Sequence, residues 1–285
     1  MEEISHRMIK AGQLTLHIAE AGVGNSEPVI LLHGFPDASF GWEKQMMALA
    51  RAGFYVVAPD QRGYNLSEKP KGVKNYQVKL LVADILALAD ALNLPCFHLT
   101  GHDWGALVCW NLVTHYPQRV KRLVILNVPH PAVMNEFLKT NWQQRLRSWY
   151  AFFFQLPVLP ELTLGAFNWY MLANTMRHSF SELELHRYRS AWSQPGAMTA
   201  MINWYRGLFQ QPAKNAPVEK IQVPTLMIWG KLDPHLMWQM APGSIALCEN
   251  GRLEFIEDAT HWVHQEKPER VNDLLVDHFS VKTAE

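Results

Sequence analysis

The feature that most constrains the fold is an alternation of short apolar segments with helical patterns along the first 128 residues. Continuous apolar segments bounded by turn residues are typical of strands that are covered on both faces of a sheet. This alternation favours an α/β fold with a mainly parallel, doubly wound sheet. Strands are predicted at 14–20, 29–33, 55–60, 97–100 and 120–128, and helices at 40–51, 76–92 and 106–116.

The alternation stops between residues 129 and 217, where helical patterns dominate and no clear strand is recognised. It resumes with a strand at 225–229, a helix-like stretch, a strand at 253–257 and a final helix after His261. We therefore predict one core domain, residues 1–128 and 218–285, with a helical lid inserted between two core strands at residues 129–217.

The predicted lid is rich in aromatic residues. It holds the segment Phe152-Phe153-Phe154 and five of the chain's 11 tryptophans, namely Trp142, Trp149, Trp169, Trp192 and Trp204. An aromatic lid above the ends of the strands would enclose an apolar pocket, although we expect most of these rings to form the core of the lid itself. Exposed lid aromatics would also allow two chains to pair, so we expect a monomer or a homodimer.

Composition excludes several classes of function. The 26 basic and 26 acidic residues cancel and no block of Lys and Arg stands out, so the electrostatic footprint of a nucleic-acid-binding protein is missing. No segment approaches the roughly 20 apolar residues that cross a bilayer, and the first residues lack the features of a secretory signal. We expect a cytoplasmic protein that acts on a small, uncharged molecule and does not contact a membrane.

The three cysteines, Cys96, Cys109 and Cys248, are widely spaced along the chain. They form neither a disulfide framework nor a metal-binding C-x-x-C pair. We expect small apolar side chains in a reducing compartment. The sequence predicts no metal and no cofactor.

The segment Gly101-His102-Asp103-Trp104-Gly105 carries the strongest chemical signal. It lies between a predicted strand and a predicted helix, which is the context of a nucleophile elbow, a sharp turn flanked by small residues. Serine hydrolases carry a hydroxyl at the centre of this turn, whereas this chain carries the carboxylate of Asp103. A carboxylate nucleophile forms an alkyl ester that water must then cleave. The alternative role for Asp103 is that of a helix N-cap.

Cleavage of such an ester needs a general base for the attacking water. Enzymes with this elbow carry the nucleophile, the acid and the histidine in that order along the chain. We predict His261, in the loop after the last strand, as the base, and Asp233, just past the strand before it, as the acid that orients the base. His264 and Asp258 are the alternatives.

The tetrahedral intermediate of ester cleavage needs backbone donors for its oxyanion. The loop His33-Gly34-Phe35-Pro36 follows another predicted strand and offers the N–H of Phe35. The second predicted donor is the N–H of Trp104, the residue after the nucleophile. Pro36 is a candidate for a cis peptide bond in this tight loop.

Together these segments resemble the epoxide hydrolases of the α/β-hydrolase superfamily over essentially the whole chain. The similar segments are His33-Gly34-Phe35-Pro36-Asp37, Asp60-Gln61-Arg62-Gly63-Tyr64, His261-Trp262 and Glu266-Lys267-Pro268. Asn65 stands where that family usually has a glycine, and asparagine tolerates a left-handed backbone. The resemblance implies the α/β-hydrolase fold with a helical cap.

The resemblance also implies two lid tyrosines that donate hydrogen bonds to the oxygen of an epoxide. Tyr150 and Tyr205 lie in contexts similar to those of the family. A phenol with a pKa of about 10 stays protonated at neutral pH, so it can assist the departure of an alkoxide. The expected reaction is hydrolysis of apolar epoxides, aryl-substituted ones included, to vicinal diols. The side chains expected to bind the substrate are Phe35, Trp104, Trp149, Phe154 and Trp262.

Two other functions are open from the sequence. Haloalkane dehalogenases share the fold and often the Asp-Trp-Gly sequence, so Trp104 does not distinguish them. They commonly hold the halide with an Asn where this chain has Phe35, and they do not need the paired lid tyrosines. A non-catalytic, ligand-binding protein of the same fold would be favoured by loss of the nucleophile, the base or the acid, and none of the three is missing.

Overall fold

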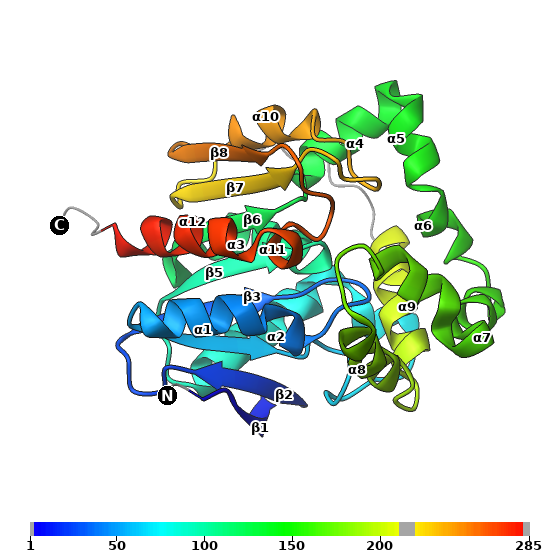
Figure 1. Cartoon of the computed structure of the whole chain (residues 1–285), viewed down its shortest axis with the longest axis horizontal. Coiled ribbons are helices and arrows are strands. Elements are labelled where there is room, and N and C mark those ends of the chain that lie inside the picture. Colours follow the sequence, from blue (N-terminus) through cyan, green and yellow to red (C-terminus); the bar gives the residue numbers. More distant parts are fainter. Residues whose placement is uncertain (1–2, 211–219, 282–285) are drawn as a thin grey trace.

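The computed structural model describes residues 3–210 and 220–281, which form one eight-stranded sheet flanked by helices (Figure 1). The strands are β1 (Ser5–Ala11), β2 (Leu14–Ala21), β3 (Glu27–Leu32), β4 (Phe54–Pro59), β5 (Phe97–His102), β6 (Val120–Leu126), β7 (Thr225–Gly230) and β8 (Gly251–Ile256). The helices outside the segment between β6 and β7 are α1 (Glu43–Arg51), α2 (Val78–Ala91), α3 (Trp104–His115), α10 (Met240–Ile245), α11 (Val263–Glu266) and α12 (Pro268–Ser280). Between β6 and β7 lie α4 (Pro131–Thr140), α5 (Trp142–Arg147), α6 (Trp149–Phe153), α7 (Leu159–Met176), α8 (Glu182–Trp192) and α9 (Ala197–Phe209), which we call the cap helices.

The sheet is mainly parallel, which confirms the predicted fold class. Its strand order is β1-β2-β4-β3-β5-β6-β7-β8. Strands β3 to β8 run parallel to one another, and β2 pairs antiparallel with both β1 and β4. Because parallel strands end at the same edge of a sheet, the loops that follow β3, β5, β6, β7 and β8 lie close together there.

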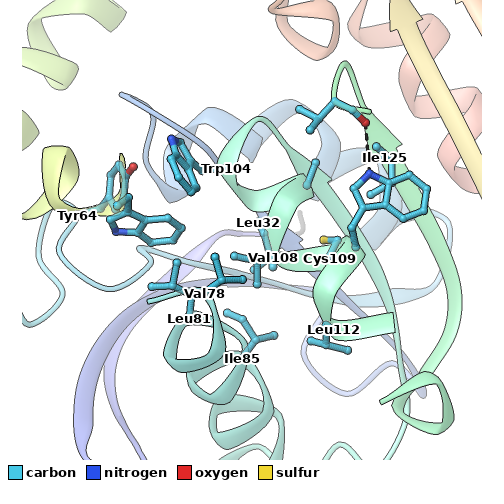
Figure 2. Packing of buried hydrophobic residues seen from close by; sticks show 14 of the residues in the cluster. Leu32, Tyr64, Val78, Leu81, Ile85, Trp104, Val108, Cys109, Leu112 and Ile125 are labelled. Atoms are coloured by element: carbon cyan, nitrogen blue, oxygen red, sulfur yellow. Dashed lines mark hydrogen bonds between the residues drawn. The ribbon is translucent and has the colours of Figure 1, made fainter. Parts of the chain in front are cut away.

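Successive side chains of the central strands point to opposite faces of the sheet. In β3, Val29 and Leu31 belong to the apolar core that is covered by α1 and α12. Ile30 and Leu32 belong to the opposite core, which is covered by α2 and α3 (Figure 2). Burial on both faces explains why the central strands read as continuous apolar segments in the sequence.

Every described element between β6 and β7 is a helix, and α6 to α9 lie beyond the arrowheads of the central strands (Figure 1). Two indole N–H groups of these helices bond to backbone carbonyls of the core. Trp192 donates to Pro36 at 2.6 Å and Trp204 donates to Arg62 at 2.9 Å. The assignment of 129–217 to a separate lid domain stays a prediction, and its boundary at 217/218 lies outside the described residues.

The five tryptophans of the cap helices differ in how deeply they are buried. Trp192 and Trp204 are buried, as expected of residues in the core of a lid. Trp142 and Trp149 are 63% and 58% exposed, so they contribute little to that core. Trp169 is partly buried, and its indole N–H donates to the hydroxyl of Ser193 at 2.9 Å.

One strand, β1, was not predicted from the sequence, and it lacks the usual signal. Strand β1 pairs with β2 along its whole length, but its first four side chains are all exposed, so it shows no clean alternation of apolar and polar residues. Helix α10 lies where a helix-like stretch was predicted between two strands, although its six residues include Pro242 and Gly243, which are the poorest helix formers.

Two smaller expectations, those for Asn65 and Pro36, are met. The three cysteines are free. Asn65 has a positive φ of 39°, and its side chain donates to Asp60 Oδ2 at 2.8 Å. The peptide bond between Phe35 and Pro36 is cis. Within residues 3–210 and 220–281, no helix combines the length and the apolar character that a membrane span requires.

Gly105 lets α3 lie directly against the end of β3. A Cβ at this position would lie 2.1 Å from the carbonyl oxygen of Leu32, so the backbone would have to move. We expect Gly105→Ala to lower the free energy of unfolding by about 2–3 kcal/mol, measured by denaturant unfolding. Gly243→Ala is the control, because its Cβ would meet only Val133 at 3.5 Å, an ordinary contact. Equal losses in the two variants would contradict this explanation.

Candidate active site

Asp103 occupies a strained turn between β5 and α3. Its φ of 49° and ψ of −122° lie in a region that side chains other than glycine rarely adopt. Asp103 stands at the N-cap position of α3, yet its side chain makes no capping hydrogen bond. The N-cap alternative therefore does not account for its carboxylate, which is turned away from the helix.

The loop after β3 meets this carboxylate. The backbone N–H of Phe35 donates to Asp103 Oδ1 at 2.7 Å. Gly34 makes the approach possible, because a Cβ there would lie 2.3 Å from Asp103 Oδ1. The other predicted donor, the N–H of Trp104, belongs to the first residue of α3, immediately after Asp103.

The predicted base and acid lie beside Asp103. His261 Nε2 lies 3.7 Å from Asp103 Oδ2, and His261 Nδ1 lies 2.7 Å from Asp233 Oδ2. All three groups come from loops at the carboxyl ends of strands, β5, β7 and β8.

The two alternative residues lie elsewhere. The closest charged partner of His264 is Asp37, at 3.9 Å between Nε2 and Oδ2. Asp258 is exposed and pairs with Lys267 at 2.5 Å. Geometry thus favours His261 and Asp233 over both.

Asn127, which sequence reasoning missed, holds Asp233 in place. Its side-chain amide follows β6, is fully buried, and donates to Asp233 Oδ2 at 2.8 Å. Its carbonyl oxygen accepts from the N–H of Gly230 at 3.1 Å. Asp233 Oδ1 accepts two further backbone N–H groups, from His235 at 2.7 Å and Leu236 at 2.9 Å. No local motif marks Asn127, although its place just after a predicted strand is a weak signal.

The two carboxylates keep a proton on His261. Burial alone would lower the pKa of its imidazole, but the charge of Asp233 and the hydrogen bond and charge of Asp103 outweigh burial and raise the pKa to about 10. The charge of His261 in turn holds the pKa of buried Asp233 below its usual value. At neutral pH His261 is therefore protonated and Asp233 is ionised.

An aromatic cluster from the cap helices lies over this group. The ring of Tyr205 contacts Phe35, Trp104 and Phe154, with centroids 5.4, 4.8 and 4.8 Å away. Tyr150 joins the cluster at 6.0 Å from Tyr205. Burial and the charge of Asp103 raise the pKa of both tyrosine hydroxyls, so both stay protonated at neutral pH.

Two of the residues expected to bind substrate are not in this cluster. Trp149 is 58% exposed, and its ring packs against Phe153 on the same helix. Trp262 is buried, but it packs on His102 and Phe180, beside His261. Tyr150 and Trp149 are neighbours in α6, but their side chains point in different directions. The sequence does not show which of the two faces the site.

A second histidine lies in the site and was missed. The ring of His235 packs edge to face with those of His261 and Tyr150, at 5.2 and 6.0 Å between centroids. It follows Asp233 by two residues, which is the signal that could have located it.

A buried polar cluster lies next to His261. Asp37, His102 and His264 each have a side-chain nitrogen or oxygen atom that lies within 4.8 Å of the corresponding atoms of the other two. Asp37 Oδ1 accepts from the hydroxyl of Tyr188 at 2.6 Å, and His102 Nε2 bonds to the carbonyl of His261 at 2.9 Å. Within the described residues, Asp37 Oδ2, His102 Nδ1 and both ring nitrogens of His264 have no hydrogen-bond partner. Buried polar atoms of this kind are usually satisfied by water.

Comparison with known proteins agrees with the fold and with the resemblance seen in the sequence. Residues 27–268 match the family described as alpha/beta hydrolase fold. The chain is 38% identical to the AB hydrolase superfamily protein YfhM of Bacillus subtilis, over 98% of this chain and 99% of that protein. It is 36% identical to Epoxide hydrolase 3 of Mus musculus, over 94% of this chain and 74% of that protein.

A solved structure is similar over the same extent. The crystal structure of Bacillus megaterium epoxide hydrolase in complex with an inhibitor matches with a TM-score of 0.89 and 28% identity, over 96% of this chain and 100% of that chain. The fold, the arrangement of Asp103, His261 and Asp233, and these similarities lead to one conclusion. The chain belongs to the epoxide hydrolases of the α/β-hydrolase superfamily.

Proposed function

We propose that the protein hydrolyses apolar epoxides to vicinal diols through a covalent ester on Asp103. Its main support is one group of contacts: the Asp103 carboxylate accepts the N–H of Phe35 and faces His261, which is paired with Asp233. Two protonated tyrosines beside this group suit a reaction whose leaving group is an alkoxide.

Asp103 opens the ring in the first step. Oδ1 is held by Phe35, so Oδ2 is the oxygen that attacks the epoxide carbon. The C–O bond of the ring breaks, and the departing oxygen takes a proton from Tyr150 or Tyr205. The product is a neutral hydroxyalkyl ester on Asp103 and one tyrosinate.

Water cleaves the ester in the second step. His261 takes a proton from the water as its oxygen attacks the carboxyl carbon of Asp103. The N–H groups of Phe35 and Trp104 receive the oxyanion of the tetrahedral intermediate. When the intermediate collapses, the bond to the diol oxygen breaks, this oxygen takes the second proton of the attacking water, and the diol leaves with the Asp103 carboxylate restored and His261 protonated. Asp233 orients the imidazole and stabilises its charge.

Ester formation itself prepares His261 for this step. The charge of Asp103 is one of the causes that raise the pKa of His261 to about 10. Esterification removes that charge, so the pKa of His261 falls and the imidazole becomes able to act as a base. The order of the two steps is thus built into the electrostatics of the site.

The surroundings of Asp103 favour uncharged, apolar substrates. Phe35, Trp104, Phe154 and the two tyrosine rings offer aromatic surface and no charge. Aryl-substituted epoxides suit such surroundings. In this proposal the segment 129–217 acts as the lid that carries the tyrosines and excludes water.

The proposal is tested with racemic styrene oxide. We expect diol from the wild-type protein and none from Asp103→Ala, whereas His261→Gln accumulates an ester seen as a mass increase of one epoxide molecule. Asp258→Ala is the matched control, because this exposed carboxylate lies outside the site. Diol formation by Asp103→Ala at the wild-type rate would overturn the mechanism. If the wild type forms no diol, halide release from haloalkanes is the next reaction to test.

The tyrosine pair gives a second test. We expect Tyr150→Phe or Tyr205→Phe alone to slow ring opening roughly tenfold, and the double variant to slow it by about 10² to 10⁴, because each hydroxyl can partly replace the other. The rate of ester formation is measured in single turnovers. Tyr170→Phe is the control, since Tyr170 is half exposed on α7. Ring opening at the wild-type rate in the double variant would rule out this role.

A further inference from the structure

The proposed reaction, on which this inference rests, leaves a tyrosine without its proton and His261 with one between its two steps. Ring opening takes a proton from a tyrosine and produces a tyrosinate. His261 still carries the proton that the two carboxylates held on it, so it cannot yet act as a base. One proton must therefore pass from His261 to the tyrosinate in every turnover before water can attack the ester.

His235 packs against both the donor and the acceptor of that proton. The centroid of its ring lies 5.2 Å from that of His261 and 6.0 Å from that of Tyr150, and its plane is nearly perpendicular to both. No side-chain hydrogen bond of His235 is formed within the described residues, and neither of its nitrogens is among their buried, unpartnered atoms. Its nitrogens are therefore free to exchange protons. No direct hydrogen bond joins the His235 ring to either neighbour, so each transfer in this role passes through a bridging water.

We infer that His235 carries the proton from His261 to the Tyr150 phenolate and so makes Tyr150 the tyrosine that is deprotonated in ring opening. One nitrogen of its neutral ring accepts the proton while the other donates a proton towards Tyr150, and a second exchange with water restores the original tautomer. The transfer needs no oxidant and leaves the net charge of the site unchanged, because the His261 cation and the Tyr150 phenolate are neutralised together. His235 acts through two other residues and does not touch the reacting carbon.

The electrostatics of the position agree with this role. Burial and the positive charges of His261 and Arg147 lower the pKa of His235, whereas the charges of Asp233 and Asp103 oppose that shift. The ring is therefore neutral at neutral pH, so it offers one acceptor and one donor nitrogen at the same time. These residues and Tyr150 are the titratable or charged groups that face it.

The backbone of His235 is fixed independently of its ring. Its N–H donates to Asp233 Oδ1 at 2.7 Å, and its carbonyl accepts from Gln144 Nε2 at 2.9 Å. His235→Ala and His235→Gln therefore keep both contacts, and the glutamine variant also keeps a polar side chain that cannot carry a proton. His186→Ala is the control, since His186 is exposed on α8.

The experiment follows ester and diol separately, by rapid quench and mass spectrometry with enzyme in excess over styrene oxide. We expect ester formation within about twofold of the wild-type rate in both His235 variants and ester decay slowed about tenfold or more. Added imidazole should restore decay in His235→Ala, where it fits the space, and not in His235→Gln. His186→Ala should match the wild type.

Ester decay at the wild-type rate in both variants would overturn the inference. Equal slowing of both steps, with no effect of imidazole, would assign His235 a structural role instead and also overturn it. Failure of the proposed function is recognised separately, because the wild-type protein would then form neither ester nor diol.

Discussion

The strained backbone of Asp103 is the constraint on which the rest of the site depends. A residue in such a conformation costs about 1–3 kcal/mol and persists only where its surroundings enforce it. Here β5 and α3 enforce it, because residues of both belong to the apolar core on the face of the sheet that α2 and α3 cover. Gly105 also lets α3 lie against the end of β3. The turn frees the carboxylate from its own helix, so it can meet the amide of Phe35 and the ring of His261.

Charge balance within the site then gives the chemistry its order. Asp233 is fixed by Asn127 and by two backbone amides, so it acts as a permanent anion. The charge of Asp103 is present in the free enzyme and absent in the ester. In our account it determines whether His261 keeps its own proton or accepts one from the attacking water. In this account a single esterified oxygen changes the role of the base without any movement of the chain.

The alternation of strands and helices and the elbow around Asp103 were predictable because they depend on local sequence. Chain order does not separate Asp233 and His261 from Asp258 and His264, because all four follow Asp103 in the expected order. The places of Asp233 and His261 in the loops after predicted strands led to the choice, and their contacts agree with it. Asn127 and His235 were missed because their importance comes from distant contacts, to Asp233 in one case and to Tyr150 in the other. Trp149 was misplaced for a similar reason, since the face of α6 that meets the site is set by packing.

The covalent role of Asp103 is tested most directly by a single turnover in water labelled with oxygen-18, with enzyme in excess over styrene oxide. An oxygen of Asp103 becomes the new hydroxyl in our account. The diol of the first turnover should therefore be unlabelled, and the label should appear in the peptide that contains Asp103. A labelled diol with an unlabelled Asp103 would show that water attacks the epoxide directly and would contradict the account.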